Sequence, residues 1–145
     1  MIKVLLDTNV VLDAIANREP FHLDAQKIIN SILDNELEGY ITANSITDIY
    51  YVARKYLNQN DLFTAMRSLF EIFSIIDVLG ADCHKALDFP LDDYEDALLA
   101  VCGNKAEINC IITRDEEFLD KSKSILSISI ISPVEFLRKN FAKNS

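Results

Sequence analysis

The sequence predicts an α/β fold in which a mainly parallel sheet is covered by helices on both faces. Apolar runs of strand length alternate along the chain with amphipathic segments of helix length, a pattern typical of parallel strands joined by helical crossovers. Hydrophobic residues make up 50% of the 145 positions, enough for a sizeable core. No linker, repeat or change of composition divides the chain, so we expect a single domain over residues 1–145.

Strands are expected at the short apolar runs, and Gly80 closes the third of them. They are Ile2–Leu6, Gly39–Ile41, Ile75–Leu79, Cys110–Ile112 and Ile128–Ile131. Right-handed crossovers place the carboxyl ends of parallel strands along one edge of the sheet. Ligands of open α/β sheets bind at that edge, so functional residues are expected there.

Helices are expected in the segments between and after the strands. They are Asn9–Ala16, His22–Asn35, Ser45–Leu57, Asp61–Phe73, Asp82–Asp88, Asp92–Ala106 and Pro133–Asn140. In the third helix, Ile49, Ala53 and Tyr56 recur at helical spacing. Pro90 stops the fifth helix, acids begin the sixth, and Pro133 is suited to the start of the last.

Four acids from distant segments are expected to meet at the carboxyl edge of the sheet. Asp7 directly follows the first strand, and Asp115 follows the fourth. Asp48 and Asp96 lie in the first turns of their helices, which begin at the same edge. Carboxylates crowded into one pocket repel each other unless one is protonated or a cation enters. Oxygen ligands without histidine or cysteine favour Mg²⁺ or Mn²⁺, ions that activate water for phosphodiester hydrolysis.

Structural explanations for these acids remain open at this point, because acids are common in turns and near the starts of helices. Asp48 is placed to form a capping box with Ser45, although Glu or Gln is usual at that position. Asp115 stands in an acidic run that is also typical of a solvated turn. The acids at the start of the sixth helix are Asp92, Asp93 and Asp96.

Charge and composition limit the remaining classes of function. The 14 Lys and Arg against 23 Asp and Glu give a net charge of −9, which argues against broad, charge-driven adhesion to nucleic acid. Bound nucleic acid should then need metal ions and a small basic rim, for which the candidates are Arg18, Arg54, Lys55 and Arg114. The three glycines form neither a dinucleotide-binding nor a P-loop motif, and there is no GxSxG sequence. The apolar runs are too short to span a membrane and no signal peptide is evident, so a cytoplasmic protein is expected.

Four motifs, in order and covering essentially the whole chain, resemble those of PIN domains. They are VLLDTN at residues 4–9, SITDI at 45–49, YEDALLA at 94–100 and ITRDEEF at 112–118. The resemblance implies a three-layer αβα sandwich and a Mg²⁺- or Mn²⁺-dependent ribonuclease. The short single-domain form is similar to VapC-type toxins, which implies RNA as substrate, an antitoxin protein as partner and a possible homodimer.

The resemblance also implies roles for individual residues. The metal ligands would be Asp7, Asp48, Asp96 and Asp115. Polar groups that support them or position water would be Thr8, Asn9 and Thr113, and further acids would be Asp93 and Glu117. The second acid of such toxins is usually Glu, whereas Asp48 is one methylene shorter.

Two other functions compete with a nuclease. One is a binding or scaffold domain that keeps a degenerate PIN fold without catalysis. The other is a metal-dependent receiver or phosphotransfer domain, which would need paired acids after the first strand and an acceptor Asp after a central strand. Asp7 stands alone after its strand, and Asp77 is expected inside the third strand, so the receiver alternative ranks lowest.

Overall fold

A five-stranded, entirely parallel sheet forms the centre of the protein, seen in a computed structural model that describes residues 1–121 and 127–141. The strands are β1 (Lys3–Leu6), β2 (Glu38–Thr42), β3 (Ser74–Ile76), β4 (Cys110–Ile112) and β5 (Ser129–Ile131). Their order across the sheet is β3-β2-β1-β4-β5. The chain therefore adds β2 and β3 on one side of β1. It then returns and adds β4 and β5 on the other side of β1. This reversal makes the carboxyl ends of β1 and β4 the switch point of the sheet.

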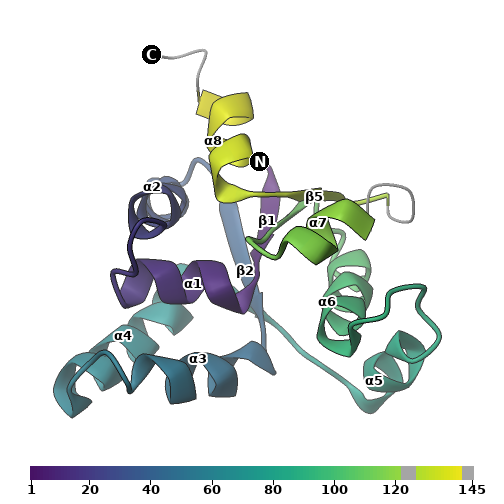
Figure 1. Ribbon diagram of the computed structural model, residues 1–145, viewed down its shortest axis with the longest axis horizontal. Coiled ribbons are helices and arrows are strands. Elements are labelled where there is room, and N and C mark those ends of the chain that lie inside the picture. The colour runs from purple at the N-terminus through teal and green to yellow at the C-terminus, as the bar shows by residue number, and fades with distance from the viewer. Residues whose placement is uncertain (122–126, 142–145) are drawn as a thin grey trace.

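Helices cover both faces of the sheet, as Figure 1 shows. On one side lie α1 (Thr8–Ile15), α2 (His22–Leu33), α3 (Ser45–Ala53), α4 (Gln59–Ile72) and α8 (Pro133–Phe141). On the other lie α5 (Gly80–Ala86), α6 (Tyr94–Lys105) and α7 (Glu116–Lys121). The predicted αβα sandwich is thus confirmed. Among the described residues, no helix has the length and apolar character needed to cross a lipid bilayer.

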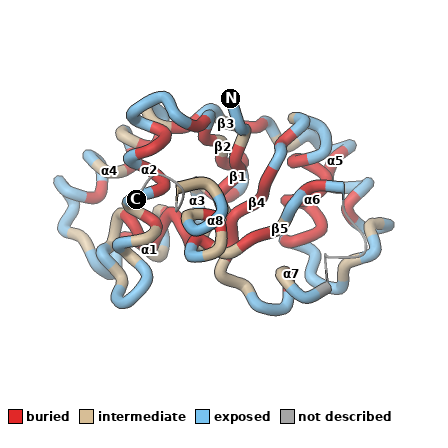
Figure 2. The backbone as a smooth tube through the Cα atoms, turned by 90° about the horizontal axis from the view of Figure 1, so that it is seen from above, coloured by how far each residue is buried: buried red, intermediate tan, exposed pale blue. Residues whose placement is uncertain are grey.

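The strands supply both halves of the core because their side chains alternate between the two faces. Val4 and Leu6 pack with the α1–α4 side, whereas Leu5 between them packs with α6. In the neighbouring β4, Ile112 joins the first cluster and Ile111 the second. Figure 2 shows the central strands as buried segments between the helices. The rigid carboxyl edge that results carries the acids.

The third strand is shorter than predicted, and the segment from Val78 to Leu79 is not part of it. β3 pairs only with β2, and this partner ends at Thr42, so the ladder has no neighbour beyond Ile76. The backbone carbonyl of Asp77 instead accepts a hydrogen bond from Lys105 Nζ at 2.7 Å. Asp77 therefore follows the strand rather than lying inside it.

Two local interpretations of the acidic segments also need correction. The N-cap of α3 is Asn44, so Ser45 does not form the capping box with Asp48; its hydroxyl donates to the Thr42 carbonyl at 2.7 Å. The acidic run after Asp115 is not an irregular turn but the helix α7. The Oδ1 of Asp115 accepts from the Glu117 backbone N–H at 3.1 Å, which is how a side chain caps a helix start.

Candidate active site

Asp7 is held at the end of β1 by hydrogen bonds to both of its carboxylate oxygens. As N-cap of α1, it accepts the Thr8 backbone N–H on Oδ1 at 2.8 Å. Its Oδ2 accepts the hydroxyl of Thr113 at 2.8 Å. The carboxylate is thereby fixed in orientation by the first helix on one side and by the segment after β4 on the other.

Thr113 links two of the predicted acids. It is fully buried directly after β4, and its Oγ1 donates to Asp7 while accepting the backbone N–H of Asp115 at 3.1 Å. The amide of the intervening Arg114 donates to the Oδ1 of Asn9 at 3.3 Å. The structure thus brings Asp7, Thr8, Asn9, Thr113 and Asp115 together at the switch point between β1 and β4.

Asp96 lies in the first turn of α6 with only 8% of its surface exposed. Its backbone N–H is capped by Asp93 Oδ1 at 3.1 Å, so Asp93 serves the helix start as well as adding a charge nearby. Burial, followed by the negative charges of Asp93, Asp115, Asp7 and Glu95, raises the pKa of Asp96 to about 8. The group therefore binds a proton in the metal-free protein at neutral pH.

Further pKa shifts place Asp7, Asp48 and Glu95 in the same electrostatic environment. Burial raises the pKa of Asp7, and the charges of Asp115 and Asp93 raise it further. Burial also raises the pKa of the Glu95 carboxyl, with Asp48 as the largest charge contribution. Asp48, on the exposed face of α3, thus faces the start of α6 across the carboxyl edge of the sheet. The charges thus group Asp7, Asp96 and Asp115, and Glu95 links Asp48 to this group.

This acidic cluster fits a divalent cation by its chemistry. Its donors are carboxylate oxygens, the ligands that Mg²⁺ and Mn²⁺ prefer, and a dication would offset the negative charges that, after burial, raise the pKa values. Within residues 1–121 and 127–141, no three Asp, Glu, His or Cys side chains stand as a ready-made metal site. Cation binding would consequently require adjustment of the more exposed side chains, such as Asp48 of α3 and Glu95 of α6.

The four basic residues expected to form a rim for nucleic acid fall into two groups. Arg18 Nε contacts Asp13 Oδ1 at 2.9 Å, and Arg114 Nε contacts Asp13 Oδ2 at 2.5 Å. Both arginines therefore neutralise a carboxylate that is completely buried in α1. Arg54 and Lys55 are exposed at the end of α3, and the guanidinium of Arg54 lies 4.9 Å from the centre of the Tyr51 ring.

Sequence reasoning missed Asp13 and Glu95. Asp13 carried a signal, because it is a lone charge within the otherwise apolar run of α1 and Arg18 follows five residues later. Its second partner, Arg114, is 101 positions away, a pairing that no local pattern reveals. Glu95 is part of the third acidic motif, but only the fold shows that Asp48 lies near it.

Known proteins share the fold of this chain. The family model for the PIN domain matches residues 3–117. Ribonuclease VapC1 of Aquifex aeolicus is 26% identical over 130 residues, which cover 86% of this chain and 90% of that protein.

Crystal structures of the same fold include DNA-bound VapBC from Salmonella typhimurium, with a TM-score of 0.66 at 17% identity and coverage of 92% of this chain and 99% of the other. The sarcin-ricin loop cleaving toxin VapC20 of Mycobacterium tuberculosis also has a TM-score of 0.66, at 11% identity, over 87% of this chain and 98% of that one. The family match extends from β1 through the acids of all four motifs. The chain belongs to the PIN domain family.

Proposed function

We propose that this PIN domain is a Mg²⁺- or Mn²⁺-dependent endoribonuclease. The observation that carries the proposal is the meeting of acids from separate segments: Thr113 hydrogen-bonds both Asp7 and the backbone of Asp115. Burial, and after it the charge of Asp115, raises the pKa of both Asp7 and Asp96. Perturbed pKa values cluster at functional sites, and a bound cation would offset the repulsion between these carboxylates. The similarity to a protein named Ribonuclease VapC1 supports RNA as the substrate.

The ligand roles go to Asp7, Asp48, Asp96 and Asp115, with Asp93, Glu95 and Glu117 as further acids at the rim. A bound dication would activate water and neutralise charge that develops on the phosphoryl group. Thr113 fixes the orientation of Asp7 through its hydroxyl and the position of Asp115 through its backbone. Asp96 must lose its proton before it can bind a metal ion. Because its pKa is raised to about 8, metal binding should become stronger as pH rises through this value.

We also propose that the protein is the toxin of a toxin–antitoxin pair. Several structures with this fold are described as VapBC or toxin–antitoxin complexes, among them those from Rickettsia felis and Klebsiella pneumoniae. An antitoxin protein is accordingly the partner we propose, together with a homodimer and a cytoplasmic location.

The purified protein is expected to cleave single-stranded RNA only when Mg²⁺ or Mn²⁺ is present, and EDTA should stop the reaction. Asp96→Asn should abolish cleavage, because it removes one carboxylate from the coupled group. The matched control is Asp77→Asn, the same change at an exposed acid after β3, which should keep full activity. Product formation is measured on denaturing gels.

Cleavage that continues unchanged in excess chelator would exclude the metal mechanism. If intact RNA is bound and never cut under any metal condition, the chain is instead a PIN-fold binding domain. Loss of activity in Asp77→Asn but not in Asp96→Asn would place the chemistry at the end of β3 and overturn the proposed ligand set.

A further inference from the structure

Helix α3 leads away from the acidic cluster and carries a large exposed aromatic side chain on the way. Asp48 and Tyr51 are three residues apart, a spacing that puts both on one face of a helix. Tyr51 is 54% exposed, although most large hydrophobic side chains of α3 face the core. Arg54, three residues further on, is the C-cap of α3 and contacts the Tyr51 ring.

The Tyr51 ring is held by aromatic and cationic neighbours. The guanidinium of Arg54 lies 4.9 Å from its centre, a cation–π distance. The Tyr50 ring meets it edge-on, with 5.2 Å between centroids and 89° between planes. Tyr50 in turn contacts Phe63 of α4, with centroids 6.2 Å apart. A ring positioned in this way loses little further freedom when a ligand stacks against it.

Arg54 differs from Arg18 and Arg114, which are both occupied by Asp13. Among the ion pairs of the described residues, none involves Arg54, whose guanidinium instead contacts the Tyr51 ring. A guanidinium on an aromatic face can receive a stacked base and still reach a phosphate. We call Tyr51 and Arg54 the α3 platform.

We propose that the α3 platform binds a nucleobase of single-stranded RNA beside the site of cleavage. This inference rests on the proposed function and names the contact that holds its substrate. Two observations support RNA: Tyr51 follows Asp48 at helical spacing, and its ring is paired with an arginine. Because the net charge of −9 argues against binding through phosphate contacts alone, stacking of bases on an aromatic ring is the expected source of affinity.

The test measures binding separately from cleavage. All proteins keep native Asp96, and Ca²⁺ replaces Mg²⁺ so that a dication is present while the RNA stays intact, which denaturing gels verify. Fluorescence anisotropy follows a fluorescein-labelled oligoadenylate. Tyr51→Leu should weaken binding roughly fivefold to a hundredfold, the range for loss of one stacked base. Tyr51→Phe should bind as the parent does, because the ring remains. An abasic ribose–phosphate chain of equal length has no base to stack, so the parent and Tyr51→Leu should bind it with equal affinity.

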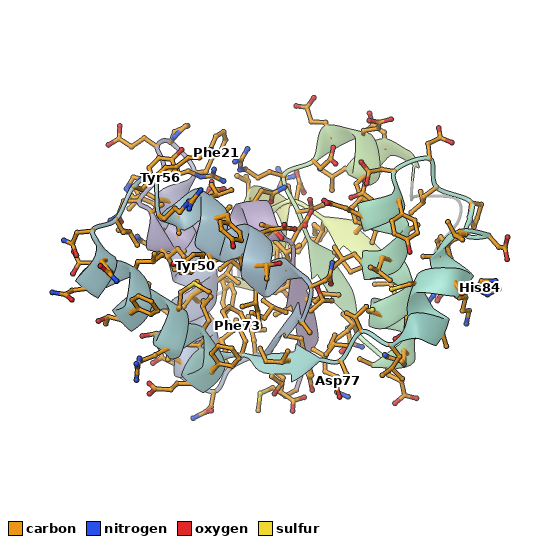
Figure 3. The ribbon with its side chains drawn as sticks, turned by 90° about the horizontal axis from the view of Figure 1, so that it is seen from below. Phe21, Tyr50, Tyr56, Phe73, Asp77 and His84 are labelled. Atoms are coloured by element: carbon orange, nitrogen blue, oxygen red, sulfur yellow. The ribbon has the colours of Figure 1, made fainter. Side chains whose placement is uncertain are left out.

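Tyr56 gives a matched control, since it is also 54% exposed but lies beyond the end of α3. Figure 3 shows it toward the end of the molecule opposite His84. Tyr56→Leu should leave the affinity for oligoadenylate unchanged. Equal losses in Tyr51→Leu and Tyr56→Leu would overturn the proposal, as would unchanged affinity in Tyr51→Leu or no measurable binding by the parent.

A protein contact is the competing use of an exposed aromatic patch. If Tyr51→Leu alters the sedimentation coefficient while oligoadenylate affinity stays the same, α3 is a surface for self-association and the proposal fails. The proposed ribonuclease activity is judged independently, by cleavage in Mg²⁺ or Mn²⁺. If the protein binds RNA through its bases and through Tyr51 but never cuts it, the proposed ribonuclease activity is wrong and the proposed role of the α3 platform stands.

Discussion

The raised pKa of the Asp96 carboxyl lowers the stability of the metal-free protein at neutral pH. Its pKa rises from the ordinary 3.8 to about 8, first through burial and then through neighbouring acids. Between these two values the folded chain keeps a proton that the unfolded chain has released. The free energy of unfolding therefore falls as pH rises through this window, and the contribution levels off above pH 8 or so.

Asp96→Asn should remove this loss, because the amide has nearly the same volume and does not ionise. In EDTA, urea unfolding of the variant should show stability equal to wild type near pH 4 and an increasing advantage toward pH 8. Low salt should enlarge the difference, since the acids are then less screened. A variant that stays less stable than wild type across the whole window would mean that Asp96 supports the start of α6 and that repulsion there is unimportant.

Between elements, the buried carboxylate of Asp13 connects α1 to the segment between β4 and α7. It forms ion pairs with Arg18, which follows α1, and with Arg114, which follows β4. The two arginine side chains are 21% and 27% exposed. The guanidinium of Arg114 also lies 3.8 Å from the centre of the Phe21 ring. Asp13 thereby fixes the segment that carries Thr113 and Asp115.

Asp13→Ala should lower the free energy of unfolding by about 3 kcal/mol, the low end for breaking a buried charge pair, because both arginines can turn toward water. Asp13→Asn should cost less, since it retains an acceptor. Urea titrations measure both, with the exposed acid changed in Glu36→Gln as control. If Asp13→Ala is no less stable than Glu36→Gln, the network does not join these elements energetically.

The elements themselves show what a sequence can and cannot predict. The apolar runs of β1 and β4 and the long amphipathic helices follow from local periodicity, and the placement of Asp7 and Asp115 follows from the rule of parallel crossovers. Helix α7 was missed because its six residues are too few for a periodic pattern, and its start is set by the Asp115 cap. β3 ends at Ile76 because its partner β2 ends at Thr42. The apolar residues after Ile76 therefore could not indicate where the strand ends. The proximity of Glu95 to Asp48 likewise depends on how two helices face each other.

For the whole molecule, the net charge of −9 and the clustered acids predict a strong response to divalent cations. A ligand that binds only the folded chain stabilises it by roughly 2.7 kcal/mol at about 100 times its dissociation constant. Mn²⁺ should therefore raise the melting temperature of wild type, measured by calorimetry. Asp77→Asn should keep the shift and Asp96→Asn should lose most of it. Equal shifts in all three proteins would indicate diffuse screening of charge, with no specific site.

The hydrogen bond between Thr113 and Asp7 joins residues 106 positions apart in the sequence. This separation determines when the site can form during synthesis of the chain. A ribosome releases β1, β2 and β3 with their helices well before β4 emerges. Until then the carboxyl edge of β1 lacks its neighbour, Asp7 lacks Thr113, and Asp115 has not been made. Contacts between such distant segments form late, since a long loop must close first. The proposed ribonuclease would therefore be inactive while most of its own message is being translated.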